Sequence, residues 1–133
     1  MKRTGWLKRS TEKARAWIER RSPLPKVNRK RKAKLHAEQF GPPGFGDFVR
    51  SRGCVVARQM GSVAGCLGPM QHCHRKSRAA GGKWRDNSFC ACLAHHAEEH
   101  NMGQETFERA YGLDLDLEAC VVTHQWDLRE MGR

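Results

Sequence analysis

Four potential metal ligands lie close together in the stretch Cys92–His100, which reads CLAHHAEEH. On an α-helix, where successive residues turn by about 100°, Cys92 and His95 lie about 60° apart, and His96 and His100 lie about 40° apart. The two pairs point about 90° away from each other, so all four side chains cannot hold a single ion. The stretch therefore predicts a helix that carries two separate metal sites.

Two cysteines upstream can complete the site of Cys92 and His95. With Cys54 and Cys66 the set becomes three cysteines and one histidine, which suits tetrahedral zinc. A position near a helix N-terminus also favours the thiolate form of Cys92. The alternative is that Cys54 and Cys66 are ordinary buried thiols, because their separation is longer than in a usual zinc knuckle. We favour structural Zn²⁺, since a domain of fewer than 100 residues with few large apolar side chains needs an additional cross-link.

The second pair, His96 and His100, leaves coordination positions open, as a catalytic metal requires. If such a metal catalyses hydrolysis, the attacking water must also lose a proton to a base. His74 is the candidate for this base because imidazole titrates near neutral pH. Asn87 can bridge a loop and a strand through its amide and so hold His74 in place. These four residues form the predicted catalytic set.

The order of predicted elements around these residues is strand, loop, strand and helix, followed by two more helices. In chain order the strands and helices are predicted over residues 69–74, 87–91, 92–101, 105–111 and 117–130. Gly103 is expected just after the first helix, and Asp116 is expected to cap the last one. The residues expected to pack the last two helices onto the domain are Phe107, Tyr111, Leu113 and Trp126. The predicted fold class is α+β, a small zinc-stapled domain with additional C-terminal helices.

Positive charge is concentrated near the N-terminus. Residues 1–36 carry 14 Lys/Arg and 2 acids, whereas residues 37–133 carry 11 Lys/Arg and 12 acids. Such a block favours a polyanion such as DNA over mere solubilisation, because each cation that meets a phosphate releases condensed counterions. We expect a short helix over 12–21, then an extended, partly disordered segment, and a hinge in the Pro/Gly-rich stretch 41–47. The predicted division is a basic arm over 1–46 and a domain over 47–133, with DNA-binding residues in the arm at Arg29, Lys30, Arg31 and Lys32.

His74, Asn87 and His96, in this order and on these elements, resemble the ββα-metal motif of HNH endonucleases. The chain is similar in particular to small phage and prophage HNH proteins, including the Ref-like recombination nucleases. The similar text covers residues 54–116 and includes HRKSRAAGGKWRDN, CACLAHHAEEH and ETFERAYGLDL. The resemblance implies a metal-dependent enzyme that hydrolyses DNA phosphodiester bonds and leaves 5′-phosphates. For a phage protein it also implies the cytoplasm of a bacterial host, and a recombinase filament as a candidate partner.

The resemblance further implies a role for each matching residue. His74 is the general base, Asn87 orients it, and His96 and His100 bind the catalytic ion, Mg²⁺ or another divalent cation. The structural zinc site of the family corresponds to Cys54, Cys66, Cys92 and His95.

The chain departs from the family pattern just before the base. Many HNH enzymes carry an acid or a histidine there as a metal ligand, whereas this chain has Cys73, whose thiolate would favour zinc over magnesium. Strand alternation places Cys73 and His74 on opposite faces and His72 on the face of His74, so Cys73, His72 or neither could join the ion. Cys90 and Cys120 are expected to be buried thiols.

The loop between the two strands is rich in cations, which are Arg75, Lys76, Arg78, Lys83 and Arg85. These cations are either solvated or in contact with DNA phosphates. We favour contact with phosphates because the loop adjoins the predicted catalytic residues. Such contacts position the protein without reading sequence. Trp84 could stack on a base or pack beneath the loop.

Two other classes of protein are alternatives to the nuclease. A non-catalytic zinc-stabilised DNA-binding protein would share the arm and the cysteines. A secreted, disulfide-bonded basic peptide is disfavoured because the N-terminus has no apolar segment of an export signal, so the six cysteines are expected in a reducing compartment. No window of 18 apolar residues is present, which argues against a membrane partner. No small-molecule substrate is expected.

Overall fold

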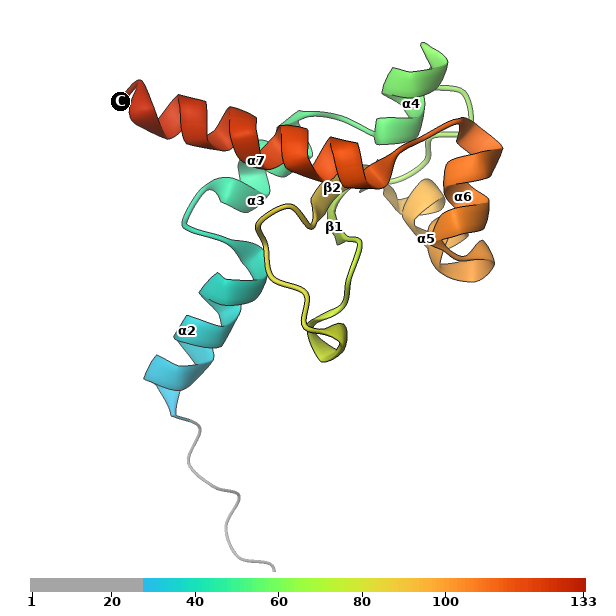
Figure 1. Ribbon diagram of the computed structural model, residues 1–133. Coiled ribbons are helices and arrows are strands. Elements are labelled where there is room, and N and C mark those ends of the chain that lie inside the picture. Colours follow the sequence, from blue (N-terminus) through green and yellow to red (C-terminus); the bar gives the residue numbers. More distant parts are fainter. Residues whose placement is uncertain (1–27) are drawn as a thin grey trace, which may run out of the picture. The chain divides into compact units, whose positions relative to one another are not determined.

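The computed structural model describes residues 28–133, in which short helices surround one small β-sheet (Figure 1). The elements in chain order are α2 (Arg29–Phe40), α3 (Phe45–Ser51), α4 (Val55–Met60), β1 (Met70–His74), a 3₁₀ turn (Arg78–Ala80), β2 (Ser88–Cys92), α5 (Leu93–Met102), α6 (Gln104–Tyr111) and α7 (Leu115–Met131). Residues 33–133 form one compact unit. The α+β prediction is confirmed at this level, and the predicted strands and three following helices lie within two residues of the observed ones. No helix among the described residues is long and apolar enough to cross a membrane.

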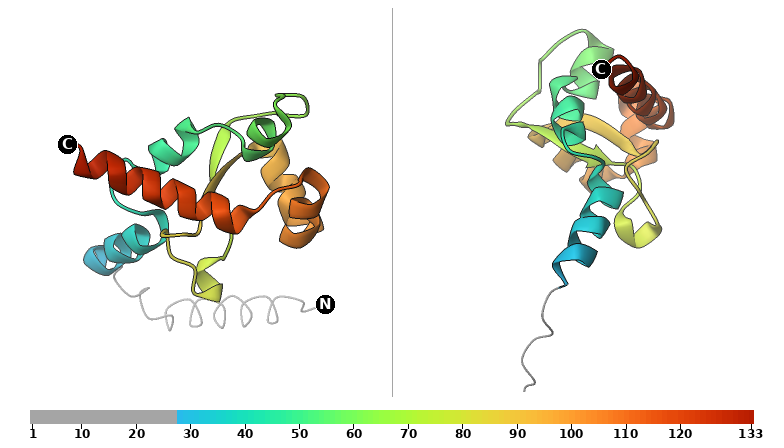
Figure 2. Two further views of the ribbon diagram at one scale, coloured as in Figure 1. Left: turned by 45° about the horizontal axis from the view of Figure 1, so that its top comes forward. Right: turned by 90° about the vertical axis from the view of Figure 1, so that its left-hand side faces the viewer.

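The sheet is an antiparallel hairpin whose register runs from Met70 opposite Cys92 to His74 opposite Ser88. Every residue of β2 is buried, so helices must cover both of its faces. The alternation of the strand sends Phe89 toward α4 and α6, and Cys90 toward α3 and α7. Two views from other directions show α7 crossing over the hairpin, with which it is in contact (Figure 2). The hairpin therefore divides the interior into two apolar clusters.

The basic run near residue 30 is helical, contrary to the predicted extended segment. α2 begins after Asn28, whose side chain accepts a hydrogen bond from the Arg31 N–H at 3.1 Å. Lys, Arg, Ala and Leu are good helix formers, and this capping contact satisfies one of the free N–H groups of the first turn. The helix predicted over 12–21 lies outside the described residues.

The Pro/Gly-rich stretch 41–47 is part of the compact unit and does not form the predicted hinge. Phe45 is fully buried, and its ring lies 4.6 Å from Trp84 and 5.4 Å from Trp126, centroid to centroid. Trp84 accordingly packs beneath its loop. The boundary expected at residue 47 therefore falls inside the unit, which begins at residue 33.

The last helix begins two residues earlier than predicted, with a different cap. The side chain of Asp114 accepts from the Leu117 N–H at 2.8 Å, and Asp116 lies inside the first turn. Cys120 is exposed, so its predicted burial is wrong. Its neighbour Ala119 occupies the buried stripe, and a residue one position along a helix points about 100° away.

Phe45→Ala should lower the free energy of unfolding by about 3–5 kcal/mol, because the substitution empties a fully buried aromatic site. Urea denaturation followed by circular dichroism measures this change. Leu128→Ala is the control, since Leu128 is exposed on α7 and its truncation should change stability by less than about 0.5 kcal/mol. A loss below about 1 kcal/mol for Phe45→Ala would show that the segment is a hinge after all.

Candidate metal centres

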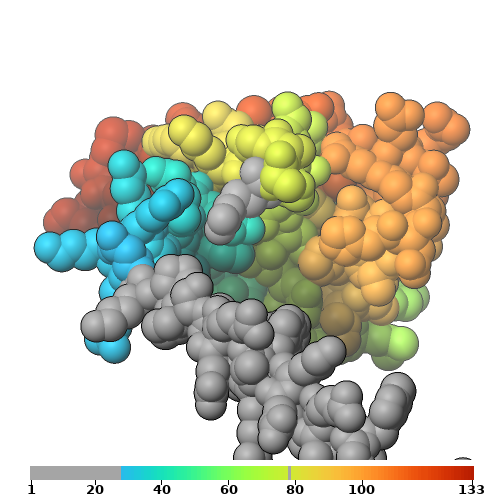
Figure 3. All heavy atoms as spheres, turned by 90° about the horizontal axis from the view of Figure 1, so that it is seen from below, coloured from blue at the N-terminus to red at the C-terminus, as the bar shows by residue number. Residues whose placement is uncertain are grey.

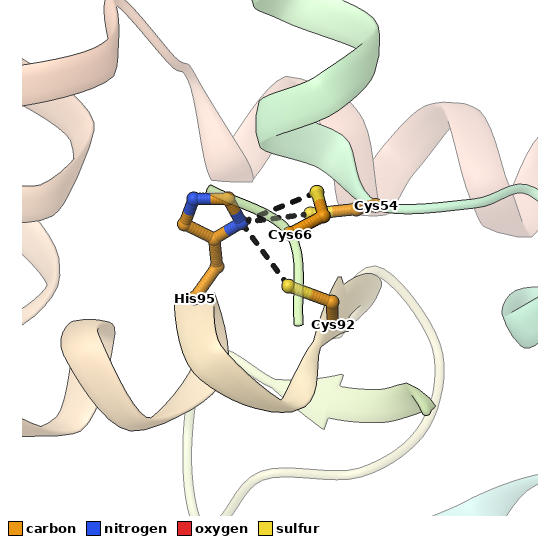
Figure 4. A group of neighbouring side chains, drawn as sticks. All are labelled: Cys54, Cys66, Cys92 and His95. Carbon is orange, nitrogen blue, oxygen red and sulfur yellow. Dashed lines mark hydrogen bonds between the residues drawn. The ribbon is translucent and has the colours of Figure 1, made fainter. Parts of the chain in front are cut away.

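Three cysteine thiols converge on one ring nitrogen of His95, Nδ1 (Figure 4). Cys54 immediately precedes α4, Cys66 lies in the loop that follows it, and Cys92 ends β2 one residue before α5 begins. The distances to His95 Nδ1 are 3.2 Å from Cys92 Sγ, 3.3 Å from Cys54 Sγ and 3.6 Å from Cys66 Sγ. The four predicted ligands are thus brought together from separate elements.

This arrangement has the dimensions of a tetrahedral zinc site. Zn–S bonds of about 2.3 Å and Zn–N bonds of about 2.0–2.1 Å place sulfur and nitrogen about 3.6 Å apart on a tetrahedron. All four ligand atoms lie within 4.8 Å of one another. Cys54, Cys92 and His95 are buried, and four protein ligands are the number that a tetrahedral ion takes. The cluster can hold a metal ion such as zinc.

The three thiols lie close enough to shift the pKa values of one another. Burial and the neighbouring thiols of Cys54 and Cys92 raise the pKa of Cys66 to about 12. Burial also raises the pKa of Cys92, but backbone N–H groups of His95 and Leu67 outweigh it, so the net shift is downward. Three sulfurs this close would repel one another as thiolates, and a divalent ion removes that repulsion.

His96 and His100 form a second group one turn along α5. Their Nε2 atoms lie 3.0 Å apart, and the Nδ1 atom of His96 lies 3.0 Å from the side-chain oxygen of Gln71 on β1. A carbonyl oxygen only accepts, so His96 Nδ1 carries the hydrogen and Nε2 keeps its lone pair. Burial, then the charges of His100 and His74, lower the pKa of His96. The imidazole of His96 is therefore neutral at pH 7 and able to bind a metal.

Glu99 belongs to this second group, and the sequence reading did not assign it a role. One ligand atom from each of Glu99, His96 and His100 lies within 4.8 Å of the others. Glu99 is 8% exposed, and burial raises its pKa. Its spacing of three residues from His96 places it on the same helical face, which is the signal that could have identified it.

His74 ends β1 and is held by the end of α2. Its Nε2 lies 2.8 Å from the Gln39 carbonyl oxygen, which is an acceptor, so Nε2 carries the hydrogen and Nδ1 is the basic nitrogen. Its ring packs edge-on against Phe40 at 5.3 Å. Burial lowers the pKa of His74, and the Gln39 carbonyl partly offsets the shift. The neutral imidazole is thus favoured.

Asn87 fixes the loop that follows His74. Its side-chain oxygen accepts from the Lys76 N–H at 2.7 Å, and its amide donates to the carbonyls of Lys76 at 3.0 Å and Lys83 at 2.6 Å. Gly82 is required beside it, because a Cβ there would lie 2.0 Å from the Lys76 oxygen. Asn87 therefore bridges loop and strand as predicted. Its hydrogen bonds hold the backbone just after His74 and not the imidazole.

The structure does not bring Cys73 or His72 to the group of His96 and His100. Cys73 is buried in the cluster beneath α4 and α6, and burial raises its pKa to about 12. His72 lies 2.9 Å from the Ser88 hydroxyl, and burial, with smaller effects of His74 and Arg50, lowers its pKa to about 4. Neither side chain belongs to the metal-binding groups found within residues 28–133.

Two of the predicted DNA-binding cations of the loop are paired with acids of α7. Arg75 forms an ion pair with Asp116, and Arg85 pairs with Asp127 at 2.9 Å. Lys76 and Lys83 are exposed, as are the α2 residues Arg29, Lys30, Arg31 and Lys32. Figure 3 shows the face on which the loop projects.

Comparison with known proteins gives no match: no family model, no curated protein and no solved structure is significantly similar to the chain. The two groups of ligands are therefore interpreted from their own geometry.

Cys54→Ser should remove one equivalent of zinc per chain relative to the unaltered protein, because it deletes one of four ligands of a closed site. Zinc content by atomic absorption and the thermal melting curve measure the effect. The melting temperature should fall by about 10 °C or more, since structural zinc contributes directly to folding and 1 kcal/mol corresponds to about 4–8 °C in a domain of this size.

The matched control is Cys120→Ser, which alters an exposed cysteine outside the cluster and should change neither quantity. Full zinc content in Cys54→Ser would rule out the site.

Proposed function

We propose that this protein is a metal-dependent endonuclease of the HNH type, which hydrolyses DNA phosphodiester bonds. The observations that support the proposal are an oriented imidazole, His74, at the end of β1, and a helix packed against the same strand, α5, that presents the paired Nε2 atoms of His96 and His100. The hydrogen bond between Gln71 and His96 joins this strand to this helix.

In this proposal His74 is the general base. Its Nδ1 accepts a proton from the attacking water, while the Gln39 carbonyl keeps the other nitrogen protonated and stabilises the imidazolium that forms. Asn87 keeps the loop after His74 in place through its three backbone hydrogen bonds. A positioned base of this kind contributes a factor of about 10²–10⁴ to the rate.

His96 and His100 are the proposed ligands of the catalytic cation, Mg²⁺ or another divalent ion. Their two Nε2 atoms lie close enough together to bind one ion. The hydrogen bond from His96 Nδ1 to Gln71 leaves Nε2 of His96 without a hydrogen, as a metal ligand requires. When bound, a divalent ion supplies charge stabilisation to the scissile phosphate and the departing 3′ oxygen.

The proposed DNA contacts are to the phosphate backbone, through the exposed Lys76 and Lys83 of the loop and through Arg29–Lys32 of α2. Arg75 and Arg85 would have to leave their partners Asp116 and Asp127 to join them. The resemblance to phage recombination nucleases extends the proposal to DNA processing in a bacterial host, with a recombinase filament as partner.

One observation favours a second candidate, a non-catalytic zinc-stabilised DNA-binding protein. The strand position that supplies a metal ligand in many HNH enzymes is occupied here by Cys73, which is buried away from His96 and His100. An ion at those histidines would then lack its usual ligand from the strand. Assays of supercoiled plasmid with Mg²⁺, Mn²⁺ or Zn²⁺ separate the candidates, because only the nuclease converts the plasmid to open circles.

His74→Ala should reduce plasmid nicking by about 10²–10⁴-fold, because the attacking water loses its base. Zinc content and the circular dichroism spectrum should be unchanged. His124→Ala is the matched control, since His124 is exposed on α7, and it should nick like the unaltered protein. Nicking by His74→Ala at the control rate would remove His74 from the mechanism.

The nicking rate should be level near pH 8 and fall with a midpoint below pH 6.5. Burial lowers the pKa of His74 beneath its ordinary 6.5, so the base is mostly neutral at pH 7 and above and becomes protonated at lower pH. Initial rates at saturating Mn²⁺ measure the profile. A midpoint above pH 7 would contradict the assignment.

A further inference from the structure

Glu99 is a mostly buried residue whose carboxylate oxygens still reach solvent. Among the described residues no hydrogen-bond donor and no Lys or Arg contacts its side chain, of which 10% is exposed, and the nearest basic atom is His100 Nδ1 at 3.8 Å. A carboxylate that no other side chain engages is available to bind an ion.

The neighbours of Glu99 on its helix indicate how it would bind an ion. Residues three and four apart lie side by side on a helix, so Glu99, His96 and His100 share one patch of α5. Each offers a ligand atom within 4.8 Å of the others. The 3.0 Å between the two Nε2 atoms falls in the range of about 2.8–3.4 Å expected for two nitrogens bound at 2.0–2.1 Å to one ion.

We propose that Glu99 is the third, anionic ligand of this site, which thus becomes a two-histidine, one-carboxylate centre for a transition-metal ion. Imidazole ligands suit Fe²⁺ and Zn²⁺, and the carboxylate also suits Mn²⁺, whereas Mg²⁺ prefers oxygen ligands alone and retains its waters. Three protein ligands leave positions open for a phosphate oxygen and water. The catalytic use of the ion rests on the proposed function, but its binding does not.

The test measures Mn²⁺ binding by the full chain with its structural zinc retained, using the electron paramagnetic resonance signal of free Mn²⁺. The unaltered protein should bind one Mn²⁺ per chain and keep it against a tenfold excess of Mg²⁺. Glu99→Gln, which keeps the shape and removes the charge, should weaken binding by at least about tenfold. Glu105→Gln, at an exposed glutamate of α6, is the matched control and should bind like the unaltered protein.

His100→Gln is a second variant, which should fold normally because the side chain of His100 is 68% exposed. It should also bind Mn²⁺ at least about tenfold more weakly. The inference is overturned if the unaltered protein binds no Mn²⁺, if Mg²⁺ displaces it, or if Glu99→Gln binds like the control. Should Glu99→Gln lose its zinc and unfold, a crystal structure of the Mn²⁺-loaded unaltered protein decides, and a Glu99 carboxylate not bonded to the ion overturns the inference.

The two experiments distinguish a failure of Mn²⁺ binding through Glu99 from a failure of DNA cleavage. Protein that binds Mn²⁺ through Glu99 but does not nick plasmid contradicts the nuclease proposal and leaves the three-ligand site standing. Protein that nicks plasmid while Glu99→Gln binds Mn²⁺ normally contradicts the role of Glu99 and leaves the nuclease proposal standing.

Discussion

The junction between β2 and α5 is the point on which the rest of the structure depends. Cys92 is the last residue of the strand, and His95 lies in the first turn of the helix, so their shared cluster with Cys54 and Cys66 fixes the direction in which α5 leaves the sheet. A metal ion bound there would tie this helix to the segment around α4. Because His96 directly follows His95, the same geometry sets where the second group of ligands points.

A second dependence joins the hairpin to the end of α2. The Gln39 carbonyl holds His74, and the neighbouring Glu38 carbonyl accepts from the Trp84 N–H at 3.0 Å, so the helix contacts both sides of the strand-to-strand loop. The last carbonyls of a helix have no partner within the helix and are free for such contacts. His74, the proposed base, is therefore oriented by α2, a segment that the sequence analysis predicted to belong to the arm and not to the domain.

The two clusters of ligands differ in a way that suits different roles. The cysteine-rich cluster is closed and mostly buried, and its neighbours are apolar side chains of the core. The cluster of His96, Glu99 and His100 is open to solvent at His100 and is linked to β1 through Gln71. Four protein ligands fill the positions of a tetrahedral ion and leave none for a substrate, whereas the second site has an accessible side and a neutral imidazole.

The sequence by itself determined the two strands, the three helices that follow them and the pairing of ligands along α5, because helical and strand periodicity are local properties. It also identified the set of Cys54, Cys66, Cys92 and His95 from ligand chemistry. Only the tertiary structure decided the burial of Phe45 and Glu99, the exposure of Cys120, and the pairing of Arg75 with Asp116. Burial and ion pairing depend on which distant segments pack together, and no local pattern contains that information.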